Sequence, residues 1–330
     1  MTSPVATTLT APPELSIIIP AFNEAEGLAA FLEQLFRVLH GCCTDFEVWV
    51  IDDGSRDATW QQARNEQAKY PQLRGVQFTR NFGKEAAILA GLRHARGRAV
   101  IVMDSDGQHP PSLLPNMLKL WRGGGAQIVA AQKASRDSDG WRARLNARIF
   151  NGMMLALTGL NLAGASDFRL LDRRVVDTLL AFPERVRFFR GMTVWTGFTT
   201  VNLDFDVAPR IAGSSQWSTT QLTNLAITAI TSFSAKPLSL IFRLGFFGMA
   251  AAVLLLIQSI YSWFSGVAIS GWTSLTVIVL FFGSATLLSI GVLGAYFAQI
   301  FNEIKGRPEF LVREMLTEEL PKGTSKISTS

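Results

Sequence analysis

Four aspartates stand in two short motifs whose chemistry suits a metal ion and a phosphate group. Asp52 and Asp53 lie in "IDDGS", and Asp104 and Asp106 lie in "MDSDGQHPP". Either motif alone could be a surface turn, because turns favour Asp and Gly. Mg²⁺ and Mn²⁺ take hard oxygen ligands, commonly carboxylates together with substrate phosphate oxygens. The two motifs together predict a divalent ion carrying a diphosphate, with Gln108 adding an amide oxygen.

Spacing excludes several other sites. An EF-hand calcium loop starting at Asp104 needs Gly at its sixth position and a carboxylate at its twelfth, but His109 and Pro115 stand there. The sequence has neither the Gly-x-Gly-x-x-Gly of dinucleotide-binding enzymes nor the Gly-Lys-Ser/Thr of P-loop proteins. His109 either shapes the loop before Pro110 or contacts the metal or substrate. Lys84 either reaches the diphosphate or caps its helix in solvent.

The acidic motifs follow segments with the pattern of buried strands. Up to about Pro209, short runs rich in Val and Ile alternate with helical periodicity, which is typical of a parallel sheet with helices on both faces. In such sheets ligands bind beyond the carboxyl ends of the strands, which is where the acidic motifs fall. The expected strands are Leu15–Pro20, Phe46–Asp52, Leu73–Thr79 and Arg98–Asp104, and the expected helices are Glu24–Leu39, Asp57–Ala68 and Gly83–Arg96.

The last third of the chain has the composition of membrane helices. Only 17% of the residues are charged, against roughly 25% in ordinary soluble proteins, and none between Leu244 and Asn302 is Asp, Glu, Lys, Arg or His. Leu238–Trp263 and Trp272–Asn302 each exceed the roughly 20 residues that cross a bilayer as a helix. Lys and Arg flank both segments but are absent from the link between them. The positive-inside rule therefore predicts two transmembrane helices with both termini in the cytoplasm.

Two amphipathic segments are candidates for the membrane surface. Trp141–Leu157 has an apolar stripe with Arg142, Arg144 and Arg148 off it. It could meet a lipid phosphate, or it could be an ordinary surface helix. Trp217–Phe233 repeats apolar residues at helical spacing without basic residues on its polar face. It could lie in the membrane interface or pack against the soluble domain.

Composition limits the remaining possibilities. The net charge of +5 suits anionic lipid or phosphate but does not require nucleic acid. The adjacent Cys42 and Cys43 are expected to be reduced and buried. Residues 1–13 are rich in Thr, Ala and Pro and are expected to be a disordered lead-in without a secretory signal.

The motifs together resemble those of a known enzyme family. "SIIIPAFNEAEGL", "VIDDGSRDAT", "RNFGKEAAILAGL", "VMDSDGQHPPSLLP", "SDFRLLDRRVVD", "ERVRFFRGM" and "SFSAKPL" resemble the inverting family-2 glycosyltransferases with the GT-A fold, from about Leu15 to Pro308. The most similar branch is the polyprenyl-phosphate glycosyltransferases, which include bactoprenol glucosyltransferases and dolichyl-phosphate mannose synthases. The resemblance implies a GT-A (Rossmann-like) α/β domain, an interfacial helix and two transmembrane helices.

The resemblance also implies roles for residues. Nucleotide-sugar binding is expected of Pro20, Asn23, Glu24, Asp52, Asp53, Lys84 and Asp104. Metal binding is expected of Asp104, Asp106 and Gln108, and catalysis of Asp106, Asp167 and Arg169. Acceptor-phosphate binding is expected of Lys133, Arg136, Arg144, Arg148 and Arg210, with Arg187 and Arg190 as further candidates.

The expected reaction moves a hexose from a nucleotide sugar to a polyprenyl phosphate such as undecaprenyl phosphate, with inversion. It uses Mg²⁺ or Mn²⁺ at the cytoplasmic leaflet of the cell membrane. UDP-glucose is the first candidate donor because "RNFGKEAA" resembles the glucosyltransferase branch. A GDP-mannose-dependent synthase and a non-catalytic, membrane-anchored sugar-nucleotide-binding protein remain alternatives. The resemblance implies a homo-oligomer, a tetramer in the most similar branch.

Some positions depart from the family pattern. Ser166 replaces the usual Gly before Asp167, His109 replaces an Asp, and Gln216 replaces a Lys that could touch phosphate.

The expected organisation is a catalytic domain at 14–210, an acceptor loop with a juxtamembrane helix at 211–236, two spans at 237–303 and a cytoplasmic tail at 304–330.

Overall fold

The computed structural model describes residues 11–105, 107, 109–133, 152, 155–156, 158–159, 165–185, 187–205, 236–265 and 271–316. They belong to two compact units. The first lies within Met1–Asn146, Leu162–Gln216 and Arg307–Ser330, and the second within Ala147–Asn161 and Trp217–Gly306. The amphipathic segment Trp217–Phe233 and most of Trp141–Leu157 lie outside the described residues.

The described part of the first unit contains one eight-stranded sheet in the order β7-β5-β6-β4-β1-β2-β3-β8. The strands are β1 (Leu15–Ala21), β2 (Phe46–Asp52), β3 (Leu73–Phe78), β4 (Ala99–Val102), β5 (Ile128–Lys133), β6 (Ala165–Asp172), β7 (Thr200–Phe205) and β8 (Val312–Leu316). Strands β4, β1, β2 and β3 run parallel, as do β5 and β7. Strand β6 runs antiparallel to β4 and β5, and β8 antiparallel to β3. The expected mostly parallel sheet is confirmed.

Helices cover both faces of this sheet. They are α1 (Ala25–Cys42), α2 (Thr59–Gln67), α3 (Lys84–His94), the 3₁₀ turn η1 (Pro111–Leu113), α4 (Leu114–Arg122), α6 (Arg173–Ala181) and α7 (Phe189–Trp195). Apolar residues of α1, α2 and α4 share one core with the strand residues Ile17, Ile19, Val48 and Val50. Helices α3 and α6 contact β1, β2 and β4. Strands buried on both faces explain why their sequences are continuous apolar runs rather than alternating ones.

Helix α3 lies very close to the sheet because it has a glycine at the contact. A side chain at Gly91 would place its Cβ 2.2 Å from Cγ2 of Ile18 in β1, well inside van der Waals contact. Helix α3, which begins at Lys84, is therefore packed tightly against β1.

Strand β8 has no counterpart among the elements expected from the sequence. It pairs with the edge strand β3, and the preceding Phe310 stacks on Phe78 with ring centroids 4.9 Å apart. Glu314 in β8 accepts a hydrogen bond from Trp60 Nε1 at 2.9 Å and forms an ion pair with Arg64. The segment after the last long helix is therefore part of the first unit's sheet.

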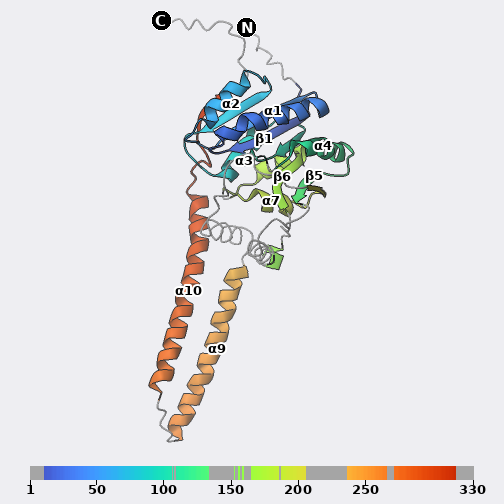
Figure 1. Cartoon of the computed structure of the whole chain (residues 1–330). Coiled ribbons are helices and arrows are strands. Elements are labelled where there is room, and N and C mark those ends of the chain that lie inside the picture. The colour runs from blue at the N-terminus through green and yellow to red at the C-terminus, as the bar shows by residue number, and fades with distance from the viewer. Residues whose placement is uncertain are drawn as a thin grey trace, which may run out of the picture. The chain divides into compact units, whose positions relative to one another are not determined.

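The second unit contains two long helices, α9 (Lys236–Phe264) and α10 (Trp272–Ile304) (Figure 1). They pack closely where Gly248 of α9 faces Phe282 of α10, since a Cβ at Gly248 would lie 3.0 Å from that ring. Many of their large apolar side chains are exposed, including Phe242, Phe246, Phe281 and Phe297. Within the described residues, one segment, Phe281–Ala298, is long and apolar enough to cross a membrane.

Candidate functional site

The loops after β1 and β2 are held to each other by hydrogen bonds. The backbone N–H of Asn23, which has a positive φ of 55°, donates to Ser55 Oγ at 2.9 Å, and Asn23 Oδ1 accepts from the backbone N–H of Arg56 at 2.9 Å. The backbone N–H of Glu24 donates to Thr59 Oγ1 at 2.9 Å. The expected nucleotide-binding residues Asn23 and Glu24 thus lie at the rim of the sheet.

Pro20 takes a different position from these two residues. It lies inside β1, where its carbonyl accepts from Ser105 Oγ at 3.4 Å. It therefore connects β1 with the loop after β4.

The first acidic pair is buried and bonded to neutral protein groups. Asp52 accepts hydrogen bonds from the backbone N–H of Ser55 at 3.0 Å and from Gln77 Nε2 at 3.1 Å. Asp53 accepts from the backbone N–H groups of Phe82 at 2.6 Å and Gly83 at 2.9 Å. Burial raises the pKa of Asp53 to about 6, although these two N–H groups favour its charged form. Asp53 therefore ties the loop after β2 to the loop that precedes α3.

A glycine lets those two loops approach each other. Gly54 has a φ of +67°, and a Cβ there would lie 2.3 Å from the backbone carbonyl carbon of Arg80. The Gly in "IDDGS" is thus required both by its backbone conformation and by the close contact.

The second acidic group is held by cations. Lys84 Nζ lies 2.7 Å from Asp104 Oδ1 and 2.8 Å from Asp167 Oδ2, so its ammonium group bridges the two carboxylates instead of projecting into solvent. Burial lowers the pKa of Lys84, but the charges of Asp167 and Asp104 outweigh this and raise it. Lys84 therefore stays positively charged.

The antiparallel direction of β6 explains why Asp167 lies near Asp104. Val102 at the end of β4 pairs with Arg169. Because β6 runs in the opposite direction, Asp167 lies two residues beyond this pair, at the level of Asp104. Residues from opposite ends of two strands thus meet at one rim.

Two arginines complete the surroundings of Asp167. Arg190 of α7 contacts Asp167 Oδ1 through Nε at 3.2 Å and Nη2 at 3.1 Å. The buried Arg169 donates to the Ser166 carbonyl at 2.9 Å and to Thr193 Oγ1.

The charges of this cluster are fixed at neutral pH. Burial alone would raise the pKa of Asp167, but Lys84 and Arg190 outweigh it and hold the pKa well below its usual range. Burial lowers the pKa of Arg169 to about 10. The cluster therefore contains an ionised carboxylate facing permanent cations.

The structure gives other roles to two residues that were possible ligands. His109 Nδ1 accepts a hydrogen bond from the backbone N–H of Asp104 at 3.0 Å, and its ring stacks on Phe168. This agrees with a loop-shaping role for His109. Arg187 donates to the carbonyls of Leu179 and Phe182, each at 2.8 Å. It therefore caps the end of α6.

Several expected site residues cannot be placed. Asp106, Gln108, Arg136, Arg144, Arg148 and Arg210 lie outside the described residues, and Lys133 is the last residue of β5. In the described part of the chain, no three His, Cys, Asp or Glu side chains gather to hold a metal. However, oxygens of Asp104 and Asp167 converge on one positive centre, the Lys84 ammonium. Such hard donors fit the expected Mg²⁺ or Mn²⁺.

Sequence reasoning did not identify Thr193 or Glu85 as part of this region. Thr193 accepts from Arg169, and Glu85 accepts from the backbone N–H of Phe189. Arg190 was expected only to bind phosphate, and its contact with Asp167 was not foreseen. The sequence carried no distinct signal for Glu85, because Asp and Glu are common in the first turn of a helix.

Comparison with known proteins agrees with the motifs. Residues 16–180 match the model of glycosyl transferase family 2. An uncharacterized glycosyltransferase of Synechocystis sp. is 36% identical over 92% of this chain and 95% of its own length. The bactoprenol glucosyl transferase of Shigella phage SfII is 34% identical over 91% of this chain and 98% of its own. A mannosyltransferase of Pyrobaculum calidifontis, solved with GDP-Man and Mn²⁺, is 17% identical with a TM-score of 0.45, covering 85% of this chain and 88% of its own.

The first two relatives are each more than 30% identical to this chain, and each match covers more than nine tenths of it. The chain therefore belongs to glycosyl transferase family 2.

Proposed function

We propose that this glycosyltransferase moves glucose from UDP-glucose to a polyprenyl phosphate such as undecaprenyl phosphate, with inversion, at the cytoplasmic leaflet. The proposal is supported by similarity to bactoprenol glucosyl transferases over 91% of the chain. The observation in the structure that carries it is the bridge from Lys84 to Asp104 and Asp167 at the sheet rim. There, carboxylates that suit a metal and a sugar lie beside cations that suit phosphates.

The arrangement of charge suits a reaction between two anionic groups. A nucleoside diphosphate leaves with growing negative charge, and the acceptor is itself a phosphate. Asp104 and Asp167 would repel both, so cations are needed among them. Lys84 and Arg190 are within hydrogen-bonding distance of these carboxylates and can exchange them for phosphate oxygens. Preorganised cations of this kind stabilise charge that develops in a transition state.

Asp167 is better suited to orient a substrate than to remove a proton. Its low pKa, set by Lys84 and Arg190, makes it a weak base. A phosphate acceptor already carries negative charge near neutral pH, so the reaction does not need a strong base. We assign Asp167 to holding the sugar or the acceptor, and Arg169 to keeping β6 in place through Ser166 and Thr193.

A divalent ion would be held by Asp104 together with Asp106 and Gln108. When bound, Mg²⁺ or Mn²⁺ would neutralise charge on the diphosphate leaving group. Asn23, Glu24, Asp52 and Asp53 would shape the nucleotide site, as their positions at the rim suggest. Lys133, Arg136, Arg144, Arg148 and Arg210 stay candidates for the acceptor phosphate.

The connection of β8 supports two membrane crossings. Phe205 at the end of β7 and Val312 at the start of β8 belong to one sheet, so the chain between them must cross a membrane an even number of times. If α10 crosses, as Phe281–Ala298 can, then α9 crosses as well. Both termini would lie on the side of the catalytic domain, and the enzyme would be a multi-pass protein of the cell membrane. Assembly into a tetramer is proposed from the family resemblance alone.

The test is transfer of label into lipid. Full-length protein in detergent is mixed with undecaprenyl phosphate, Mg²⁺ and radiolabelled UDP-glucose, other UDP-sugars or GDP-mannose, and the lipid fraction is counted. Label from UDP-glucose, and none when undecaprenol replaces its phosphate, is the expected result. Label only from GDP-mannose would establish the mannose-synthase alternative. A lipid fraction that stays unlabelled with every donor would refute the proposal.

A further inference from the structure

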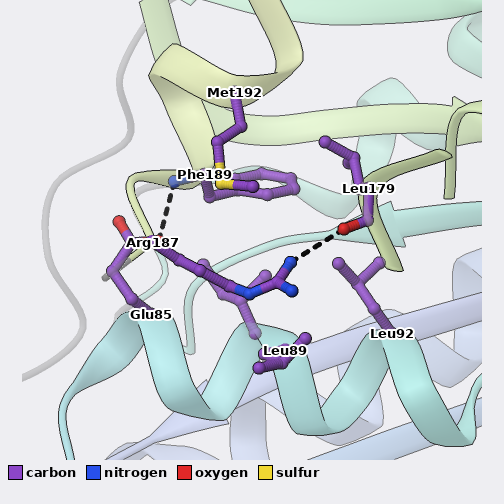
Figure 2. Close-up of a pocket in the computed structure, with 8 residues that line it drawn as sticks. Glu85, Leu89, Leu92, Leu179, Arg187, Phe189 and Met192 are labelled. Carbon is purple, nitrogen blue, oxygen red and sulfur yellow. Dashed lines mark hydrogen bonds between the residues drawn. The ribbon is translucent and has the colours of Figure 1, made fainter. Parts of the chain in front are cut away.

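Glu85 is an acidic residue beside the candidate site, and it is not one of the residues expected to bind the metal, the nucleotide sugar or the acceptor phosphate. It is the second residue of α3, directly after Lys84. Its Oε2 accepts a hydrogen bond of 2.7 Å from the backbone N–H of Phe189, the first residue of α7 (Figure 2). The bond joins residues 104 positions apart in the chain, so it is a tertiary contact and not part of either helix.

Glu85 is half-buried, and its partner Phe189 is buried. Glu85 lines a small cavity of about 10 Å³ with apolar residues of α3, α6 and α7 and with Arg187 (Figure 2). The neighbouring lining residues are Ile88, Leu89, Leu92, Leu179, Phe189 and Met192. A cavity of this size holds about one water molecule. A buried N–H that lost Glu85 would therefore have few other acceptors.

Helix α7 carries the groups that contact Asp167 and Arg169 of β6. Arg190, directly after Phe189, contacts Asp167. Thr193, three residues later, accepts from Arg169 and donates to the Arg190 carbonyl at 3.0 Å. Helix α7 has only seven residues, and so short a helix is not stable by itself. Its position depends on tertiary contacts, which include its buried residues Gly191 and Met192 and the hydrogen bond to its first residue.

We propose that Glu85 is a positioning residue, which fixes the start of α7 through the Phe189 N–H and thereby holds Arg190 against Asp167. This inference rests on the proposed function for its effect on transfer. Consecutive residues of α3 then act on Asp167 by two routes: Lys84 contacts it directly, and Glu85 sets the position of its second cation. The role needs a hydrogen-bond acceptor at the right distance and does not need the negative charge.

Three substitutions separate these features. Glu85→Ala removes the acceptor, and Glu85→Asp keeps the charge but shortens the side chain by one methylene. Glu85→Gln keeps the length and a carbonyl acceptor but removes the charge. The matched control is Glu33→Gln on α1, since Glu33 is 63% exposed and forms an ion pair with Arg37 on the same helix. All four are made in the full-length protein.

Amide hydrogen exchange measures the protection of the α7 backbone, including the Phe189 N–H, and does not depend on activity. In Glu85→Ala and Glu85→Asp we expect peptides that cover residues 189–195 to exchange at least about 10-fold faster than in the wild type. In Glu85→Gln and Glu33→Gln we expect them to be unchanged. Unchanged exchange of α7 in both Glu85→Ala and Glu85→Asp would overturn the inference. The shorter Asp variant keeps the test open if the Ala variant does not fold.

Transfer kinetics then measure the consequence for the site. For Glu85→Ala we expect kcat to fall about 10- to 100-fold while KM for UDP-glucose changes less than about twofold, with Glu85→Gln close to wild type. If Glu85→Gln loses as much kcat as Glu85→Ala, the charge and not the acceptor matters, and the inference is wrong. A wild-type protein that transfers no label would refute the proposed function, whereas the exchange experiment would still decide whether Glu85 fixes α7.

Discussion

Two groups of aspartates lie at the same rim of the sheet, but their partners differ in kind. Asp52 and Asp53 are buried, and their oxygens accept hydrogen bonds from backbone N–H groups and an amide. Asp104 and Asp167 are 27% and 15% exposed and face Lys84 and, for Asp167, Arg190.

The difference in partners indicates different roles: Asp52 and Asp53 hold the loops of the site in place, and Asp104 and Asp167 are available to substrate. Backbone donors are fixed by the fold, so the Asp52 and Asp53 contacts hold loops together and are costly to break. Flexible, charged side chains can exchange a carboxylate for a phosphate oxygen. Mutations in the two groups of aspartates are therefore expected to have different effects.

Loss of the Asp167 charge should have the largest effect. In Asp167→Asn we expect transfer to fall at least about 100-fold, the scale of loss when reacting groups are misplaced, because Lys84 and Arg190 lose the anion that they share. Nucleotide binding, measured by calorimetry, should persist. Transfer within threefold of wild type would remove Asp167 from the site.

Asp53→Ala should instead reduce stability. The Phe82 and Gly83 N–H groups would lose their acceptor, which we expect to lower the free energy of unfolding by about 2 kcal/mol. Thermal unfolding of the purified protein measures this. Asp177→Ala is the control, because Asp177 is 62% exposed and its pair with Arg173 should contribute about 0.5 kcal/mol or less. Equal losses in the two variants would contradict the distinction between the acidic groups.

Lys84→Met should give a smaller loss of activity. Removing the ammonium leaves Asp104 and Asp167 to repel each other and the substrate phosphates, so we expect kcat/KM for the nucleotide sugar to fall about 10-fold, or about 1.4 kcal/mol. Lys84→Arg should recover part of this. An unchanged kcat/KM in Lys84→Met would mean that the bridge has no part in substrate binding.

The smallest effect concerns stability and pH. Burial and the nearby charge of Asp167 raise the pKa of Glu85 from 4.5 to about 7, against the opposing effects of the Phe189 N–H, Lys84 and Arg190; Arg187 lines the same cavity. The folded protein therefore holds this proton more tightly than the unfolded chain, and the contribution of Glu85 to stability falls as pH rises from 4.5 to 7.

Glu85→Gln removes this titration and keeps the acceptor. Its melting temperature should match that of wild type near pH 5 and exceed it by a few degrees at pH 8. Melting curves of both proteins across this range measure the difference. A difference that does not change with pH would show that Glu85 keeps an ordinary pKa in the folded protein.

Much of the fold could be predicted because its signals are local. Strands β1 to β4 are continuous apolar runs, and the helices between them repeat apolar residues at helical spacing, so their order and type could be read from short windows. The carboxyl rim followed from the parallel arrangement, which placed Asp53 and Asp104 at one edge of the sheet; the bridging position of Lys84 did not follow from it.

Contacts between distant segments could not be predicted in this way. The role of Arg187 in capping α6 and the pairing of β8 with β3 depend on segments that meet only in the folded chain. The sequence of β8, "VREML", has no feature that distinguishes it from a surface tail. Its pairing satisfies backbone groups along β3, which a short window of sequence does not record.

The sequence by itself determined the chemistry: paired carboxylates at strand ends, cations near them, and a long uncharged segment suited to lipid. These are properties of residue types and short spacings, which local patterns record. Only the tertiary structure decided which carboxylates face cations and which hold loops. The reason is that β6 runs antiparallel to β4 and carries Asp167 to the level of Asp104, and that α7 is tied to α3 through Glu85. Neither arrangement leaves a periodic signal in the chain.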